Sequence, residues 1–172
     1  MTMDTSLTIQ QIHLALRNSG IWNKRSDIMI PNVSWGFLDY EADFLVLSKS
    51  GYLTEVEIKR SWEDFKADFK KKHSHDDERV YYFYYCVHKS FADKAIEMLK
   101  EKHNKKDVAF IPAVLIYDDN GIIIKQIGNK YNAGHHRKLF LEEQLTLTRL
   151  AQLRYWNLLE KTINEKQKPY NG

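Results

Sequence analysis

Acidic side chains and one lysine recur at every second position in two neighbouring segments of the chain. Glu41 and Asp43 form the first set, and Glu55, Glu57 and Lys59 form the second. Because side chains alternate between the two faces of a β-strand, each set points to one side of its strand. Crowded carboxylates repel one another, and a hard cation with oxygen ligands relieves that repulsion. The spacing therefore predicts a magnesium or manganese site beside a lysine that orients water or neutralises charge on a phosphate.

The same spacing is also typical of solvated charges on the outer face of a half-exposed antiparallel hairpin. An aspartate followed at a distance by Glu-x-Lys occurs in many unrelated strands by chance. Spacing alone leaves both interpretations open, so the choice depends on the elements that carry these residues.

Hydrophobic periodicity predicts an α/β chain in which helices are interspersed with strands. Apolar residues at helical spacing predict helices over 7–18, 62–72, 91–103 and, as a long C-terminal helix, 136–166. Alternating, β-branched or aromatic runs predict strands over 27–35, 40–48, 52–59, 79–88, 111–117 and 122–127. The turn at 49–51 joins the two acidic strands, which brings their acidic faces side by side. Asn120 and Gly121 favour a tight turn between the last two strands.

The composition favours a single domain over residues 1–172. With 43% apolar residues, the chain is long enough to build one compact core. Cys86 has no second cysteine to pair with, and the N-terminus lacks the basic-then-apolar layout of a signal peptide. No apolar run approaches the roughly 20 residues that cross a bilayer. We therefore expect a cytoplasmic protein that does not insert into membranes, and the sequence does not indicate its oligomeric state.

Basic residues are concentrated in two parts of the chain. The net charge of +3 is too small to attract a polyanion by itself, so nucleic-acid contacts must come from local clusters. Phosphate contacts are expected at the end of the second helix and around the start of the last one, from Lys70, Lys71, Lys130, His136, Arg137 and Lys138. The alternative is that these cations are solvated helix ends or a solvated basic turn.

Three segments carry a resemblance that extends beyond the acidic residues and the lysine. They are 41–47 (EADFLVL), 55–61 (EVEIKRS) and 64–68 (DFKAD). Together they resemble the MmcB-like branch of the PD-(D/E)XK nuclease superfamily, which is associated with DNA repair. The likeness spans about residues 40–159 and includes 81–83 (YYF), 111–116 (IPAVLI) and 136–138 (HRK).

The resemblance implies a restriction-endonuclease-like core, with a mixed central sheet flanked by helices, and assigns roles on it. Asp43, Glu57 and the backbone carbonyl of Ile58 would be metal ligands, and Lys59 would be the catalytic lysine. Glu41 and Glu55 would be auxiliary acids. The chain departs from the family pattern in two places, since no proline precedes Asp43 and the first helix carries glutamines and His13 where a glutamate is common.

Two further acids have two interpretations. The resemblance hints that Asp64 and Asp68 have a role near the site. The alternative is that Asp64 caps the second helix while Asp68 pairs with Lys71 or Lys72.

The sequence therefore predicts a magnesium- or manganese-dependent enzyme that hydrolyses DNA phosphodiester bonds, in repair or in a mobile-element or defence context. A catalytically inactive DNA-binding module of the same fold is one alternative, although the joint presence of Asp43, Glu57 and Lys59 argues against it. A nuclease that acts on RNA is another, because the same chemistry serves both substrates.

Overall fold

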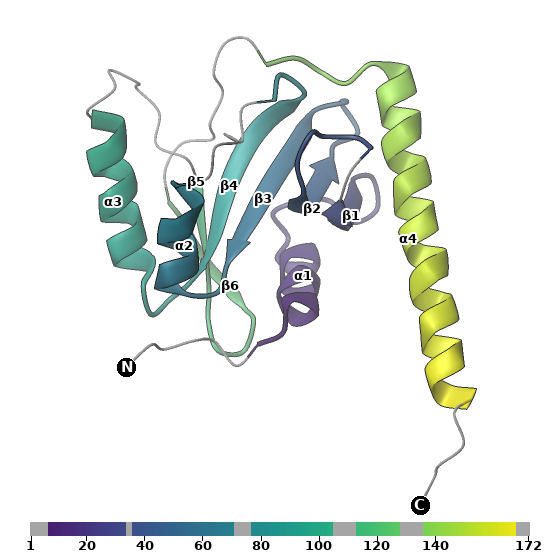
Figure 1. Cartoon of the computed structure of the whole chain (residues 1–172). Coiled ribbons are helices and arrows are strands. Elements are labelled where there is room, and N and C mark those ends of the chain that lie inside the picture. The colour runs from purple at the N-terminus through teal and green to yellow at the C-terminus, as the bar shows by residue number, and fades with distance from the viewer. Residues whose placement is uncertain (1–6, 34–35, 71–76, 105–112, 128–135, 168–172) are drawn as a thin grey trace, which may run out of the picture.

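The computed structural model describes residues 7–33, 36–70, 77–104, 113–127 and 136–167. Six strands form one mixed sheet whose spatial order follows the sequence. They are β1 (Ile28–Val33), β2 (Ala42–Leu47), β3 (Leu53–Lys59), β4 (Val80–His88), β5 (Ala113–Tyr117) and β6 (Ile123–Ile127). The helices are α1 (Ile9–Asn18), α2 (Trp62–Asp68), α3 (Ala92–Asn104) and α4 (Leu141–Gln167) (Figure 1). The predicted mixed α/β arrangement with a long C-terminal helix is confirmed.

The direction of each strand follows from its connection. β1, β2 and β3 form the predicted antiparallel meander, and β5 and β6 form the predicted hairpin. β3, β4 and β5 run parallel, because α2 and α3 carry the chain back across the sheet between them. At the hairpin turn Gly121 has φ +74°, a backbone angle that favours glycine.

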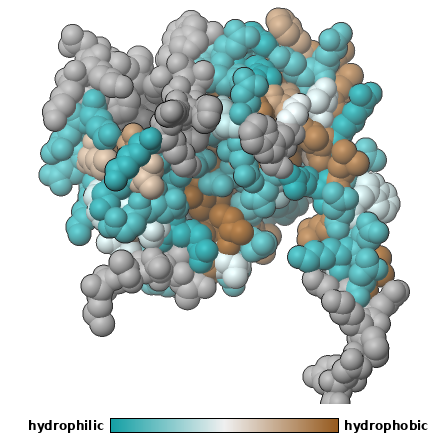
Figure 2. Space-filling view, in the orientation of Figure 1, coloured by the Kyte–Doolittle hydropathy of each residue, from teal (hydrophilic) through white to brown (hydrophobic). Residues whose placement is uncertain are grey.

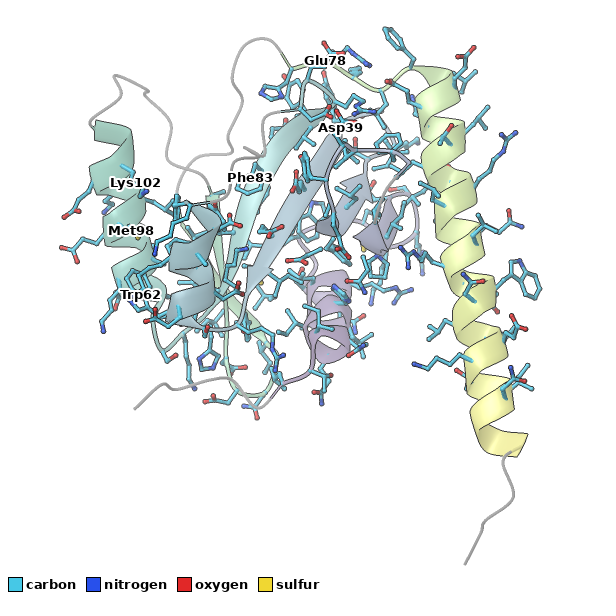
Figure 3. The ribbon with its side chains drawn as sticks, in the orientation of Figure 1. Asp39, Trp62, Glu78, Phe83, Met98 and Lys102 are labelled. Carbon is cyan, nitrogen blue, oxygen red and sulfur yellow. The ribbon has the colours of Figure 1, made fainter. Side chains whose placement is uncertain are left out.

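Side chains from the two sheet faces enter different parts of the core. On one face α1 contributes Ile12 and Leu16, which pack with the strand residues Phe44, Val46, Val56, Ile58, Tyr84, Cys86 and Leu115. On the other face Phe65 of α2, Ala95 and Leu99 of α3, and Phe91 just before α3 pack with Phe83, Tyr85, Val87, Val114 and Ile116. Trp62, Met98 and Lys102 lie between α2 and α3 (Figure 3), where Lys102 Nζ is 4.2 Å from the ring centroid of Phe69.

The last helix begins later than predicted, at Leu141 rather than His136. The residues before it are extended because their backbone bonds to other parts of the chain: Arg137 N–H donates to Glu78 O, and Leu139 N–H donates to Gly51 O, both at 2.9 Å. The Glu143 carboxylate then accepts from Phe140 N–H at 2.7 Å, which satisfies one of the free donors at the helix start. The predicted start was wrong because helical periodicity does not report these long-range bonds.

The second helix is shorter than predicted and ends at Asp68. Its start is as expected, since Ser61 Oγ accepts from Asp64 N–H at 3.1 Å. After Asp68 the ring of Phe69 lies 5.2 Å from that of Phe65, and Lys70 N–H bonds to Ala67 O in a tight turn. Residues 71 and 72, which were predicted to be helical, lie outside the described residues.

Within the described ranges, none of the helices combines the length and the apolar character that crossing a bilayer would require.

Candidate active site

The predicted acidic residues and Lys59 lie on one face of the sheet. Phe44 and Val46 of β2 and Val56 and Ile58 of β3 pack toward α1. Alternation therefore directs Asp43, Glu55, Glu57 and Lys59 to the opposite face, which α2 covers. The prediction that Asp43, Glu57 and Lys59 share a face is confirmed.

The pairing of β2 with β3 ends where these residues begin. The ladder runs from Leu47 opposite Leu53 to Phe44 opposite Val56. One residue beyond this pairing, Asp43 faces Glu57. Here the Asp43 carboxylate, rather than a backbone carbonyl of β2, accepts a hydrogen bond from the backbone of β3. Ile58 N–H donates to Asp43 Oδ2 at 2.8 Å. The Asp43 carboxylate is thereby held beside the backbone that carries Glu57 and Lys59.

Lys59 is buried between two carboxylates, with 2% of its side chain exposed. Its Nζ donates to Glu57 Oε1 at 2.7 Å and to Asp68 Oδ1 at 2.9 Å. Tyr85 OH donates to the other oxygen of Asp68 at 3.0 Å. The network joins β3, α2 and β4, so the position of the lysine depends on all three elements.

Burial and charge give Asp43 an unusual proton affinity. Burial raises the pKa of this carboxyl from 3.8 to about 6, and the negative charge of Glu57 acts in the same direction. The hydrogen bond from Ile58 N–H and the positive charge of Lys59 oppose the rise, while Asp64 adds to it. At neutral pH the Asp43 carboxylate is therefore negatively charged in surroundings that disfavour the charge.

Lys59 has the opposite balance. Burial alone would lower the pKa of its ammonium group, but the charge of Glu57 and the hydrogen bonds to Glu57 and Asp68 outweigh burial and raise it. The lysine therefore remains positively charged at neutral pH, and it cannot act as a proton-accepting base there.

The two predicted auxiliary acids differ in their surroundings. Glu55 is fully buried, and its Oε2 accepts from Tyr40 OH at 2.6 Å. Burial and the Glu55 charge raise the pKa of the Tyr40 phenol, so that group stays protonated as a donor. Glu41 is exposed and lies one residue before β2. Glu55 thus belongs to the buried acidic face, whereas Glu41 lies at its margin.

The two acids of α2 both relate to the site. Asp64 is exposed, and its charge contributes to the raised pKa of Asp43. Asp68 is buried and binds Lys59, whereas its alternative partners Lys71 and Lys72 lie outside the described residues. The helix turns Asp68 toward the sheet because Phe65, three residues earlier, packs on the same side.

The donor set is small for a metal ion. Within the described ranges, no group of three or more histidine, cysteine or acidic side chains is arranged to hold one. The predicted set of the Asp43 and Glu57 carboxylates with the Ile58 carbonyl needs only two acidic side chains, and magnesium keeps several waters in such sites. The raised pKa of Asp43 fits this set, because a cation would offset the repulsion between the two carboxylates.

The predicted phosphate-binding residues are not gathered at this site. Lys70 is exposed just after α2. Lys138 is exposed at the opposite end of β3, with its Nζ 4.6 Å from the Tyr52 ring centroid. Tyr52 lies five residues before Glu57, about 17 Å along an extended strand. Lys71 and Lys130 lie outside the described residues.

Two other predicted phosphate-binding residues already make internal contacts. His136 is buried, with its Nδ1 3.0 Å from Asp77 O. Arg137 binds the Glu143 carboxylate through two hydrogen bonds of 2.7 and 2.8 Å and also binds Glu78 at 2.9 Å. These contacts hold both side chains against other parts of the chain.

Sequence reasoning missed Tyr85 and Tyr40 at the site, and it named His13 only as a departure from the family pattern. Tyr85 lies opposite Glu57 in the parallel pairing of β3 with β4. A prediction that these two strands are parallel would therefore have found it. The Tyr40 bond to Glu55 spans 15 residues and left no local signal. His13 of α1 is buried and stacks on Phe44, with 5.6 Å between the ring centroids, next to Asp43 in the sequence of β2.

This arrangement of strands and helices also occurs in a protein of known structure. No family model matches the chain, and no curated protein matches it. A solved structure described as the SPO1766 protein of unknown function from Silicibacter pomeroyi has a TM-score of 0.55 and 17% sequence identity. The match covers 97% of this chain and 99% of that chain. At this identity the similarity is one of fold, and it extends over nearly the full length of both chains.

Proposed function

We propose that the protein is a metal-dependent nuclease that hydrolyses DNA phosphodiester bonds on a restriction-endonuclease-like core within a single domain. One observation carries the proposal. Asp43, Glu57 and Lys59 meet on a single sheet face at the point where β2 and β3 stop pairing, and the pKa of Asp43 is raised there to about 6. A carboxyl group whose pKa is raised by burial and by a neighbouring charge is expected at functional sites more often than on ordinary strand surfaces.

Magnesium or manganese would be held by Asp43, Glu57 and the Ile58 carbonyl. All three offer oxygen, the ligand that these hard cations prefer. When bound, the cation supplies a water molecule of lowered pKa and stabilises charge on the phosphate. The protein residues hold the carboxylates in place: Ile58 N–H binds Asp43, and Lys59 binds Glu57.

Lys59 supplies positive charge at the same place. Its ammonium group has three hydrogens, and the bonds to Glu57 and Asp68 account for two of them. The third would donate to a phosphate oxygen or to the attacking water. Because negative charge increases on the phosphate oxygens in the transition state, a fixed cation at this point would favour the transition state over the bound substrate.

DNA would be positioned by exposed cations rather than by the acidic residues. Lys70 is the predicted phosphate contact that follows α2, the helix that supplies Asp68. Lys138 would contact a more distant part of the duplex. The same chemistry would cut RNA, so the substrate class has to be tested directly.

An inactive DNA-binding module is the second candidate function. The observation in its favour is the burial of Lys59, which already binds two carboxylates. In that case the network would only stabilise the fold, and the domain would bind DNA without hydrolysing it.

The decisive experiment compares cleavage of single-stranded and double-stranded DNA and RNA in magnesium, manganese or calcium. We expect DNA cleavage with magnesium or manganese, and loss of cleavage in both Lys59→Gln and Lys59→Ala. Lys100→Ala, a change of an exposed lysine on α3, is the matched control and should retain activity. DNA binding without cleavage by the wild-type protein in every metal would favour the inactive module. Cleavage restricted to RNA would change the substrate.

A further inference from the structure

Large apolar side chains are unusually exposed along α4. Leu141 is 71% exposed, Leu145 49%, Trp156 55% and Ile163 45%. In Figure 1 the last turns of α4 run past α1 and the sheet, and Figure 2 shows hydrophobic side chains along the helix. Soluble proteins rarely leave apolar patches of this extent uncovered, so a surface of this kind indicates an interaction site.

The helix uses only one of its sides to bind the rest of the chain. Leu147, Leu150 and Ala151 pack against the residues of β1 and β2. At 100° per residue, Leu141 lies 120° and Leu145 lies 160° around the helix from Leu147, so both point away from that contact. The exposed residues therefore do not belong to the contact that attaches α4 to the sheet.

A second stripe of α4 is formed by the positions that share this outer side. We call it the outer stripe, and its members are Leu141, Leu145, Thr148, Gln152, Trp156, Leu159 and Ile163. The intervals between them run four, three, four, four, three and four residues, so the series is the same in both directions. Its centre is Gln152. The hydroxyl of Thr148 bonds to Gln144 O within the helix at 2.7 Å, which leaves its methyl group for packing.

A stripe with this symmetry suits one partner above others. In a dimer with two-fold symmetry the same patch is used by both copies, so the patch must be complementary to itself when reversed. Antiparallel pairing centred on Gln152 would bring Leu141 against Ile163 and Leu145 against Leu159 of a second copy. The two Gln152 amides would meet at the axis, where each can donate and accept a hydrogen bond.

We propose that two copies of this chain associate through the outer stripes of their α4 helices, packed antiparallel about a two-fold axis at Gln152. The proposal is independent of any nuclease activity. The stripe is about 33 Å long at 1.5 Å per residue, and such a helix pair buries on the order of 1,000 Å² in total. That area is near the lower limit of specific interfaces, so we expect a dissociation constant in the micromolar range.

The first test measures the mass of the full chain by sedimentation at concentrations from about 1 to 200 µM, the range in which a micromolar dimer dissociates. The wild-type protein should shift from monomer to dimer. Leu145→Glu should weaken the dimer by about 100-fold or more, because the change occurs twice and replaces a buried apolar group with a charge. Leu158→Glu is the matched control, since Leu158 is 65% exposed and lies away from the outer stripe.

Cysteine cross-linking tests the orientation. Gln152→Cys should form a disulfide with itself, Leu141→Cys alone should not, and a mixture of Leu141→Cys with Ile163→Cys should. The native Cys86 is fully buried, so it does not form disulfides with the introduced cysteines. A wild-type protein that stays monomeric at 200 µM would overturn the proposal. So would self-cross-linking of Leu141→Cys, which indicates parallel helices, or a dimer that Leu158→Glu disrupts and Leu145→Glu does not.

Discussion

Replacing Asp43 by asparagine is expected to stabilise the protein at neutral and alkaline pH. The change removes a charge that the fold holds unfavourably, because burial and Glu57 both raise the pKa of this carboxyl. An asparagine can still accept the 2.8 Å hydrogen bond from Ile58 N–H through its amide oxygen. The substitution therefore isolates the charge while leaving the local geometry in place.

The magnitude follows from the two pKa values of Asp43, about 6 when folded and 3.8 as the ordinary value. Because the folded pKa is the higher one, the stability that Asp43 contributes is fully present below pH 3.8 and is lost as the pH rises through 6. At ~1.4 kcal/mol for each tenfold change in proton affinity, the full loss is about 3 kcal/mol. Asp43→Asn should therefore exceed the wild type in stability by about 3 kcal/mol at pH 8 and by under about 1 kcal/mol near pH 4.

Urea unfolding followed by tryptophan fluorescence at several pH values between 4 and 8 measures this difference. Asp93→Asn is the matched control, because Asp93 is exposed at the start of α3. Its stability relative to the wild type should change little with pH. If Asp43→Asn is the less stable protein at pH 8, or if its difference from the wild type is the same at pH 4 and pH 8, the reasoning about Asp43 is refuted.

The same pair of proteins also tests the metal site. Magnesium at about 100 times its dissociation constant should stabilise the wild type by roughly 2.7 kcal/mol. This gain is close to the deficit caused by the Asp43 charge, so the two proteins should become nearly equal in stability at pH 8. An equal response of both proteins to magnesium would count against Asp43 as a ligand.

Three further outcomes are expected. Asp68→Ala should lower stability by about 3–5 kcal/mol because it leaves buried Lys59 with one partner fewer, whereas Tyr85→Phe should lower it by only about 1 kcal/mol in the same unfolding assay. Salt titrations of DNA binding, followed by fluorescence anisotropy, give the slope of the logarithm of the binding constant against the logarithm of the salt concentration. Lys70→Ala should reduce this slope by about 0.9. Arg137→Ala should leave it unchanged, because Glu143 and Glu78 already bind that guanidinium. Burial raises the pKa of the Cys86 thiol, so a thiol reagent should label it only after unfolding, and rapid labelling of the folded protein would contradict its placement in the core.

Local patterns in the sequence were sufficient for most of the secondary structure. The period of two in β2 and β3 predicted that Asp43, Glu57 and Lys59 share a face, because the geometry of an extended backbone fixes that alternation whatever surrounds it. The hairpin at Gly121 was predictable for a similar reason, since few residues other than glycine adopt its φ of +74°. These features depend on residues close together in the chain.

Other features depend on contacts between distant residues, and no local pattern reports those. The partner of Lys59 on α2 is Asp68, which reaches it only because α2 crosses the sheet between two parallel strands. The start of α4 is set by the bond from Leu139 N–H to Gly51 O, 88 positions away. Burial is also a tertiary property, and it decides the charge state of the site. The sequence by itself determined which residues share a face, and only the tertiary structure decided which of them are buried, paired and charged.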